Sequence, residues 1–280
     1  MAAKLLDAYF ARIRHAGDAS PTLATLERIH ALHAEHIPFE NLSPFLGEPV
    51  PLDVDSLRRK LLESGRGGWC FEHNILFAHV LVDLGYDVTR LAARVRWNVA
   101  PGTISPRSHM LLRVHVDDRD YIADVGFGGL TLTAPLRLEP GIEQATPHEP
   151  HRILSAGSGY ILEAKVGGAW QPLYTFDLQE EQLVDYERSN WYLCNHPQSH
   201  FVTGIVAARV ERDRRHALRD TRYVVHHDDG TMEKRFLTTV AEYREALAGP
   251  FTIRLPDAPH LDAKLAKLIE ANPPERRSIS

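Results

Sequence analysis

Cys70 is the residue of this chain whose type and surroundings best suit covalent chemistry. It lies in segment 66–74, Arg-Gly-Gly-Trp-Cys-Phe-Glu-His-Asn, where a glycine-backed turn runs into an apolar stretch with helical spacing. The positive end of a helix dipole and its unpaired N–H groups stabilise a thiolate, which is the nucleophilic form of cysteine. A packed core thiol is the alternative, but the two glycines would then cost entropy without an evident structural need. We therefore expect Cys70 to be a nucleophile.

A cysteine nucleophile needs a base and a group that orients the base, and these normally lie far apart in sequence. Among the 16 histidines, His109 is the best candidate, because it begins a predicted strand and could project from a sheet edge. Asp124 lies on the return strand of the same predicted hairpin, where a lone carboxylate among apolar neighbours is costly to bury. A turn near 118–119 would pair His109 with a residue close to 128 and put Asp124 roughly one diagonal away. As alternatives, His109 could be an ordinary strand-end histidine and Asp124 a turn cap.

Other reactive patterns do not fit established kinds of site. Cys194 has no glycine-rich approach and is predicted to be a plain buried residue. The histidines of 33–36 lack the spacing of a zinc protease, and the glycines of 126–129 are not followed by the helix that a dinucleotide loop requires. No metal site is expected.

Composition limits the class of protein and its partners. The 280 residues carry a formal net charge of -5, with 44% hydrophobic and 25% charged residues, which favours a full core and two or three subdomains. Without a basic surplus, a nucleic-acid partner has no electrostatic support. No apolar run approaches the roughly 20 residues of a membrane span, and the N-terminus lacks a signal-peptide core, so the expected location is the cytoplasm. Two cysteines are too few for a disulfide framework and suit a reducing compartment.

The elements that must position these residues are helical in the first third of the chain. Apolar residues recur with helical spacing near 5–13, 23–32, 57–62 and 70–81. Ser20-Pro21 is predicted to start the second helix, while Gly65 and Gly85 should end the third and fourth. These helices are expected to pack as one bundle, with Cys70 in the opening turn of the fourth.

After this, the hydrophobic period changes to that of strands. Predicted strands cover 91–97, 109–116, 121–125, 152–154, 160–166 and 170–176, with turns at 117–120 and 167–168. This pattern indicates a mostly antiparallel sheet that could roll into a barrel. A helix near 181–193, strands near 205–210, 223–226 and 233–237, and helices near 240–247 and 261–271 complete the chain. The predicted class is α+β with several subdomains, divided as 1–86, 87–190 and 191–280.

Five segments of this chain resemble successive motifs of the arylamine N-acetyltransferases, and the order and spacing of Cys70, His109 and Asp124 match as well. The resemblance extends from the first helix to at least Phe201. The segments are 37–42 (Ile-Pro-Phe-Glu-Asn-Leu), 66–74, 108–109 (Ser-His), 123–129 (Ala-Asp-Val-Gly-Phe-Gly-Gly) and 195–201 (Asn-His-Pro-Gln-Ser-His-Phe).

The resemblance implies an N-terminal helical bundle, a central antiparallel β-barrel and a C-terminal α/β lid, with a cysteine-protease-like catalytic core. It implies that Cys70 takes the acyl group, that His109 is its base and that Asp124 orients the imidazole. Coenzyme A is expected between barrel and lid, near Val95, Gly126, Phe127 and Gly128. The amine pocket should be lined by Phe39, Phe127 and Phe201, and the catalytic loop braced by Arg66 and Glu40. His73 and Cys194 depart from the family pattern, which affects the expected shape of the pocket.

The implied activity is ping-pong N-acetylation of arylamines and arylhydrazines through an acetyl-cysteine, as in xenobiotic metabolism. Acetyl-CoA would be a co-substrate, with no tightly bound cofactor and no nucleic-acid or membrane partner. The alternatives are a papain-like or transglutaminase-like thiol hydrolase, an amide synthase of a secondary-metabolite pathway, and a non-catalytic binding protein.

Overall fold

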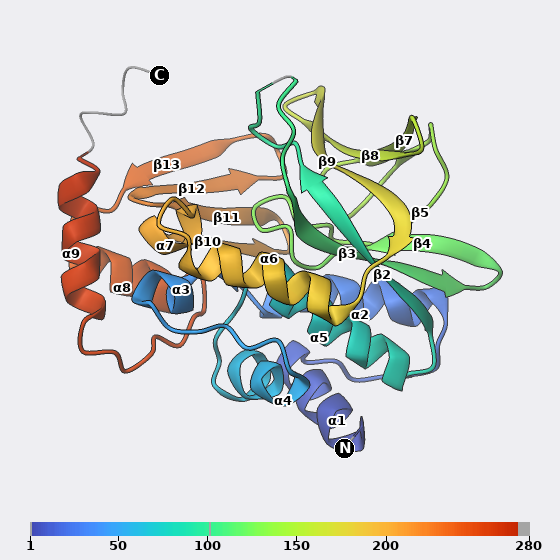
Figure 1. The fold of residues 1–280 in the computed structure, drawn as a ribbon, viewed down its shortest axis with the longest axis horizontal. Helices are drawn as coiled ribbons and strands as arrows, with labels where there is room; N and C mark the ends of the chain where they lie inside the picture. Colours follow the sequence, from blue (N-terminus) through green and yellow to red (C-terminus); the bar gives the residue numbers. More distant parts are fainter. Residues whose placement is uncertain (1, 101, 274–280) are drawn as a thin grey trace.

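The computed structural model describes residues 2–100 and 102–273. Residue 1 of the predicted first segment and residues 274–280 of the predicted last segment lie outside the described residues. Helices from the N-terminal part occupy the bottom of Figure 1, a strongly curved sheet the upper right, and a second sheet with α8 and α9 the left.

The N-terminal part is helical, as its apolar spacing predicts. Its elements are α1 (Ala2–Ile13), α2 (Leu23–His36), α3 (Leu42–Leu46), α4 (Val54–Leu57), a π-helix η1 (Arg58–Glu63) and α5 (Cys70–Asp83). The predicted start of α2 at Ser20-Pro21 is wrong, because the Thr22 side chain caps the helix by accepting a hydrogen bond from the Thr25 N–H. Gly65 and Gly85 follow their helices with positive φ of 71° and 96°, as expected of residues that end a helix.

The middle of the chain forms an eight-stranded antiparallel sheet that curls into a nearly closed barrel, in the order β5-β4-β3-β2-β9-β8-β7-β6. The turn at Gly167 and Gly168, between β8 and β9, is confirmed by positive φ at both residues. The turn between β3 and β4 is also present, but its two residues of positive φ are Asp117 and Asp118, one residue earlier than the predicted centre. The strands are β2 (Asp87–Val95), β3 (Arg107–Val116), β4 (Arg119–Ala123), β5 (Leu136–Arg137), β6 (Glu143–Gln144), β7 (His151–Ala156), β8 (Gly159–Val166) and β9 (Ala169–Glu180).

The C-terminal part contains a five-stranded sheet in the order β1-β10-β11-β12-β13. Its first strand, β1 (Phe39–Glu40), comes from the N-terminal part and pairs with β10, so that Phe39 lies opposite Ala208. Neither β1 nor β11 is predicted by the sequence pattern. The other elements are α6 (Leu183–Asn195), α7 (His200–Thr203), β10 (Val206–Glu211), β11 (Arg214–Arg219), β12 (Arg222–His227), β13 (Met232–Phe236), α8 (Val240–Ala248) and α9 (Leu261–Ala271).

α5 is the element that connects the helices to the barrel. Its buried residues share one apolar cluster with Tyr9 of α1, Ile29 of α2 and Leu112 of β3. A helix buried on nearly all sides is held rigidly by dispersion contacts, so its first turn has a fixed position relative to β3. Within the described ranges, no helix is both long and apolar enough to cross a membrane, and no group of three His, Cys, Asp or Glu residues is placed to hold a metal ion.

Candidate active site

Cys70 is the first residue of α5, which is 14 residues long. The side chain is almost buried, with 7% of the residue exposed. The Glu72 carboxylate accepts a hydrogen bond from the Trp69 N–H (3.2 Å) and so caps the helix start. Gly126 lies against this turn, and a Cβ at that position would be 2.8 Å from Cys70 Cα. The thiol therefore lies at the positive end of a helix, beside the loop that follows β4.

His109 lies on β3 between Cys70 and Asp124. Its Nε2 donates a hydrogen bond to Asp124 Oδ2 at 2.7 Å, and its ring also interacts with the Cys70 side chain. Because Nε2 is taken by Asp124, Nδ1 is the nitrogen that remains for the thiol. Burial lowers the pKa of His109, but the Asp124 carboxylate and, to a lesser degree, Cys70 more than reverse this and raise it to about 10. The three residues predicted from the sequence therefore meet in the fold.

Asp124 is fully buried, and every contact holds it as a carboxylate. Its Oδ1 accepts hydrogen bonds from Asn74 Nδ2 and from the Gly126 N–H, each at 3.0 Å, while its Oδ2 accepts from His109. Burial raises the pKa of Asp124, but His109 and these donors outweigh it, so the pKa is lowered from its usual value. Asp124 is therefore equipped to orient His109 and to stabilise its positive charge.

The predicted pairing between the two strands is wrong in register. The turn is one residue earlier than predicted, which shifts the register of the β3–β4 ladder. The ladder ends at the pair Leu112 and Ala123, where the chain leaves the sheet. His109 pairs with Ala93 of β2, not with a residue near 128. Asp124 follows the last paired residue and reaches His109 from the loop, so the two side chains meet without being cross-strand neighbours.

Asn74 is a site residue that the sequence analysis did not identify. It lies one helical turn after Cys70, and its Nδ2 donates to Asp124 and to the Met110 carbonyl oxygen (2.7 Å). Its Oδ1 accepts from the Val125 N–H at 3.1 Å. A polar residue one helical turn after Cys70, directly before the apolar stretch 75–78 of the same helix, is the signal that could have identified it.

Aromatic rings surround the triad. The Phe127 ring lies edge-on to the His109 ring with centroids 5.1 Å apart, and Tyr174, which the sequence analysis also missed, lies 5.0 Å from His109. The Phe39 and Phe201 centroids are 6.4 Å apart. All three phenylalanines predicted for the amine pocket therefore lie near the catalytic turn, which is the segment 66–70 that leads into α5, or in the loop that follows β4.

The residues predicted to contact coenzyme A also lie close to this region. Val95 ends β2, where it pairs with Tyr174 of β9. Gly128 has a φ of +86°, and a Cβ there would be 3.6 Å from Phe39 Cγ. Gly126 contacts the turn of Cys70. The loop that carries Gly126 and Gly128 therefore connects Cys70 to the Phe39 ring.

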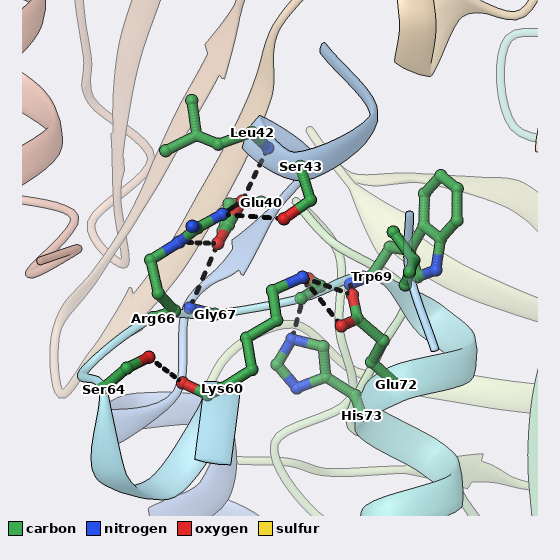
Figure 2. A network of polar contacts seen from close by, with 12 residues as sticks. Glu40, Leu42, Ser43, Lys60, Ser64, Arg66, Gly67, Trp69, Glu72 and His73 are labelled. Atoms are coloured by element: carbon green, nitrogen blue, oxygen red, sulfur yellow. Dashed lines mark hydrogen bonds and ion pairs between the residues drawn. The ribbon is translucent and has the colours of Figure 1, made fainter. Parts of the chain in front are cut away.

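The predicted brace between Arg66 and Glu40 is present and buried. Arg66 Nε donates to Glu40 Oε1 at 2.7 Å, and the same carboxylate accepts from the N–H groups of Leu42 and Gly67. Figure 2 shows this pair beside a second one, in which Lys60 Nζ contacts both Glu72 oxygens at 2.7 and 3.0 Å. Two ion pairs therefore hold the segment that precedes Cys70.

We expect Glu40→Gln to lower the free energy of unfolding by about 3–5 kcal/mol at neutral pH, because the Arg66 charge would stay buried without its partner. Burial raises the pKa of Glu40, but Arg66 and Lys60 outweigh it, so the folded pKa is lowered. Such a carboxylate stabilises the fold above its unfolded pKa of about 4.3, and this stabilisation is lost as pH falls through the folded pKa. Urea unfolding at a series of pH values should therefore show the difference between wild type and variant narrowing below about pH 4.

A matched control is Glu139→Gln. Glu139 is half exposed and pairs with Arg137 on the surface, so its replacement should change the unfolding free energy by less than about 1 kcal/mol. If Glu40→Gln and Glu139→Gln lost the same unfolding free energy, the buried pair would have no special role in stability.

Gly67 and Gly68 are required by close approach rather than by a left-handed conformation. A Cβ at Gly67 would overlap the Pro38 carbonyl oxygen, and one at Gly68 would lie 2.6 Å from Glu72 Oε2. We expect Gly67→Ala to cost about 1–3 kcal/mol of unfolding free energy, because backbone must move to admit the methyl group. Gly129→Ala is the control, since nothing lies within 4 Å of a Cβ there. Thermal unfolding of both variants checks this. A Gly67→Ala variant with the unfolding temperature of the wild type would show that the turn is loosely packed.

Cys194 lies on α6 and is partly buried, so the prediction of a plain buried residue is only partly right. Burial raises the pKa of its thiol to about 12. No imidazole is among the groups that shift this pKa, in contrast to the arrangement around Cys70. Of the two thiols, only Cys70 therefore has the surroundings of a nucleophile.

Comparison with known proteins matches this geometry to a family. The family model described as N-acetyltransferase matches residues 22–259. The chain is 43% identical over 271 residues to the arylamine N-acetyltransferase of Mycolicibacterium smegmatis, an alignment that covers 95% of this chain and 98% of that protein. The chain belongs to the arylamine N-acetyltransferase family. As an arylamine N-acetyltransferase it is an enzyme of the acyltransferase class.

Solved structures of arylamine N-acetyltransferases share the fold. The Mycobacterium tuberculosis enzyme superposes with a TM-score of 0.90 at 42% identity, covering 93% of this chain and 99% of that one. The Mycobacterium marinum enzyme in complex with CoA gives a TM-score of 0.90 at 40% identity, with coverage of 94% and 99%. The predicted α+β class with a barrel and a cysteine-protease-like core is thereby confirmed.

Proposed function

We propose that this enzyme transfers an acetyl group from acetyl-CoA to an aromatic amine or hydrazine by a ping-pong mechanism, with Cys70 as the carrier. The observation that carries the proposal is the contact of His109 with both Cys70 and Asp124, at the start of a helix, in a chain of this family. His109 is proposed as the acid and base of the reaction, and Asp124 as the group that orients it.

In the first half-reaction, the Cys70 thiolate attacks the thioester carbonyl carbon of acetyl-CoA. The new carbon–sulfur bond forms as the bond to the CoA sulfur breaks, and the departing CoA thiolate takes the proton that His109 holds. The raised pKa of His109, about 10, means that this proton is present at neutral pH. One thioester replaces another, so this step is nearly balanced in energy.

In the second half-reaction, the amine nitrogen attacks the acetyl carbonyl carbon and the bond to Cys70 breaks. His109, now neutral, accepts the proton that the amine loses, which restores the pair of thiolate and imidazolium. The buried site limits the access of water, which would otherwise hydrolyse the acetyl-cysteine.

The amine is proposed to bind among Phe39, Phe127 and Phe201, where a flat ring gains about 0.5–1.5 kcal/mol per aromatic contact beyond area burial. Coenzyme A is proposed to lie between the barrel and the five-stranded sheet, near Val95, Gly126, Phe127 and Gly128. The complex of the M. marinum relative with CoA supports CoA as a ligand of this fold. Acetyl-CoA then serves as a co-substrate, without a tightly bound cofactor.

We also propose the division of the chain into a helical part (1–86), a barrel part (87–190) and a lid part (191–280). Each part contributes to the proposed site: Cys70 comes from the first, His109 and Asp124 from the second, and Phe201 from the third. The two free cysteines suit a reducing compartment, and the cytoplasm is the proposed location.

The direct test is to trap the acetyl-enzyme. Incubation with acetyl-CoA but no amine should add the mass of one acetyl group to the peptide that contains Cys70, and later addition of an arylamine should remove it and give the acetylated amine. An adduct on Cys194 would overturn the site. An adduct that water removes as fast as an arylamine does would favour a thiol hydrolase.

A further inference from the structure

A chain of buried side chains leads from α1 to the catalytic turn without touching the triad. The Tyr9 hydroxyl lies 3.0 Å from His33 Nδ1, and His33 Nε2 lies 2.8 Å from His73 Nδ1. His73 Nε2 in turn lies 3.0 Å from the Gly68 carbonyl oxygen and 3.2 Å from that of Pro38. Tyr9 and both histidines are at most 1% exposed.

The direction of each hydrogen bond in this chain follows from its last acceptors. Carbonyl oxygens only accept, so His73 must carry its proton on Nε2 and leave Nδ1 as an acceptor. His33 therefore donates a hydrogen bond from Nε2 to His73 Nδ1. Its own Nδ1 accepts a hydrogen bond from the Tyr9 hydroxyl. Burial lowers the pKa of His73 to about 4 and that of His33 well below its usual value, so both rings are neutral at physiological pH.

His73 holds the backbone at the point where the nucleophile's turn is attached to β1. Phe39 and Gly68 form a parallel bridge there, with the Glu40 N–H donating to the Gly68 carbonyl oxygen at 2.8 Å. The Nε2–H of His73 is shared between the carbonyls on the two sides of this bridge, Pro38 and Gly68. Figure 2 shows the ring extending from α5 toward the segment that carries Gly67 and Trp69. The imidazole thus ties β1 to the residues that precede Cys70.

The same ring also supports a wall of the proposed amine pocket. The rings of His73 and Phe39 are parallel within 2°, with centroids 6.3 Å apart. Phe39 packs in turn beside Gly128 and Phe201. A substituent at 73 without a planar ring would leave one face of Phe39 without this partner.

We propose that His73 is a positioning residue of the enzyme. Held in its Nε2–H form by His33, it fixes the turn before Cys70 through its hydrogen bonds and the orientation of Phe39 through its ring. The role at Phe39 rests on the proposed function, whereas the role at the turn does not.

Two variants separate the two roles. His73→Phe keeps a ring beside Phe39 but can neither donate nor accept, while His73→Gln keeps a donor and an acceptor but has no ring. His151→Gln is the matched control, since His151 is equally buried and its pKa is likewise lowered by burial to about 4. Each protein is assayed for the rate of Cys70 alkylation by iodoacetamide, read by mass spectrometry with Cys194 as internal reference, and for kcat and KM with an arylamine.

His73→Phe should slow Cys70 alkylation about tenfold and leave the arylamine KM within about twofold of wild type, because only the buried hydrogen bonds are lost. His73→Gln should keep the alkylation rate within about threefold, yet raise the arylamine KM about fivefold through loss of the ring contact. His151→Gln should change neither quantity. In the wild type, long-range proton–nitrogen NMR spectra should show protonated Nε2 and bare Nδ1 on both His33 and His73.

A wild-type alkylation rate in His73→Phe, or a proton on Nδ1 of His73, would overturn the role at the turn. An unchanged arylamine KM in His73→Gln would overturn the role at Phe39. If His73→Phe does not fold, the NMR spectra of the wild type still test the role at the turn, and the arylamine KM of His73→Gln still tests the role at Phe39. A wild type that is alkylated at Cys70 but acetylates no arylamine would refute the proposed function and leave the alkylation and NMR results as the test of the turn.

Discussion

Replacing Cys70 with serine should lower the rate of acetyl transfer by about 10⁴-fold or more while leaving the fold intact. A hydroxyl is a far weaker acid than a thiol, so His109, which already holds a proton, cannot generate the alkoxide that attack on a thioester would need. The measurement is kcat/KM for acetyl-CoA with an excess of arylamine, together with circular dichroism and thermal unfolding of the variant.

Cys194→Ser is the control for this change. Burial keeps the thiol of Cys194 protonated, with a pKa of about 12, and its loss should leave acetyl transfer within about twofold of wild type. Retained turnover in Cys70→Ser, or loss of turnover only in Cys194→Ser, would contradict the assignment of the nucleophile.

Asp124→Asn is expected to lower kcat/KM by about 10³–10⁴-fold, the size of effect known for the corresponding change in serine protease triads. The present carboxylate accepts from His109 on one oxygen and from Asn74 and Gly126 on the other. An asparagine must turn its NH₂ toward one of these sides, where donor meets donor. The imidazole loses its counter-ion in both orientations, so the imidazolium becomes less stable, and it also loses its orienting hydrogen bond when the NH₂ faces it.

Asp120→Asn is a matched control, because Asp120 also pairs with a histidine, His115, at 2.9 Å on the exposed part of the same hairpin. It should leave kcat/KM within about twofold of wild type, since the pair is exposed and touches no proposed site residue. The pH dependence of Cys70 alkylation gives a second measurement. Asp124→Asn should lower the pKa of His109 and so move the alkaline limit of Cys70 alkylation to lower pH, and an unchanged profile would show that Asp124 does not act through His109.

Strongly periodic elements of the fold could be predicted from the sequence. The helix α9 has the predicted bounds, Leu261–Ala271, because its apolar residues recur at helical spacing over the whole stretch. β11 (Arg214–Arg219) was missed because half of its residues are arginines, which hide the strand alternation. β1 has two residues, too few for any periodic pattern, and it forms only through its distant partner β10.

The three residues of the proposed triad could be selected from the sequence because the chemistry restricts the residue types, whereas the contacts that support them could not. Nothing in the sequence shows that Asn74 reaches Asp124, since this depends on how α5 packs against β3 and the following loop. Tyr174 lies on a strand that the pattern identifies, but its position beside His109 depends on the curvature of the barrel. The error in hairpin register has a local origin, because the turn lies at Asp117 and Asp118, one residue earlier than predicted. That His109 has no partner on β4 has a different cause, since the β3–β4 ladder ends at Ala123.

The short strand β1 has a consequence for how the protein is made. It joins Gly68 on one side and Ala208 of β10 on the other, so the turn that presents the thiol is completed by a segment synthesised much later. While the ribosome is still translating the barrel, the edge that will hold Phe39 does not yet exist, and non-local pairing of this kind forms late. A nascent chain that has not yet reached residue 208 therefore lacks the partner strand of Phe39, and we expect the Phe39 wall of the proposed amine pocket to form only after β10 has been made.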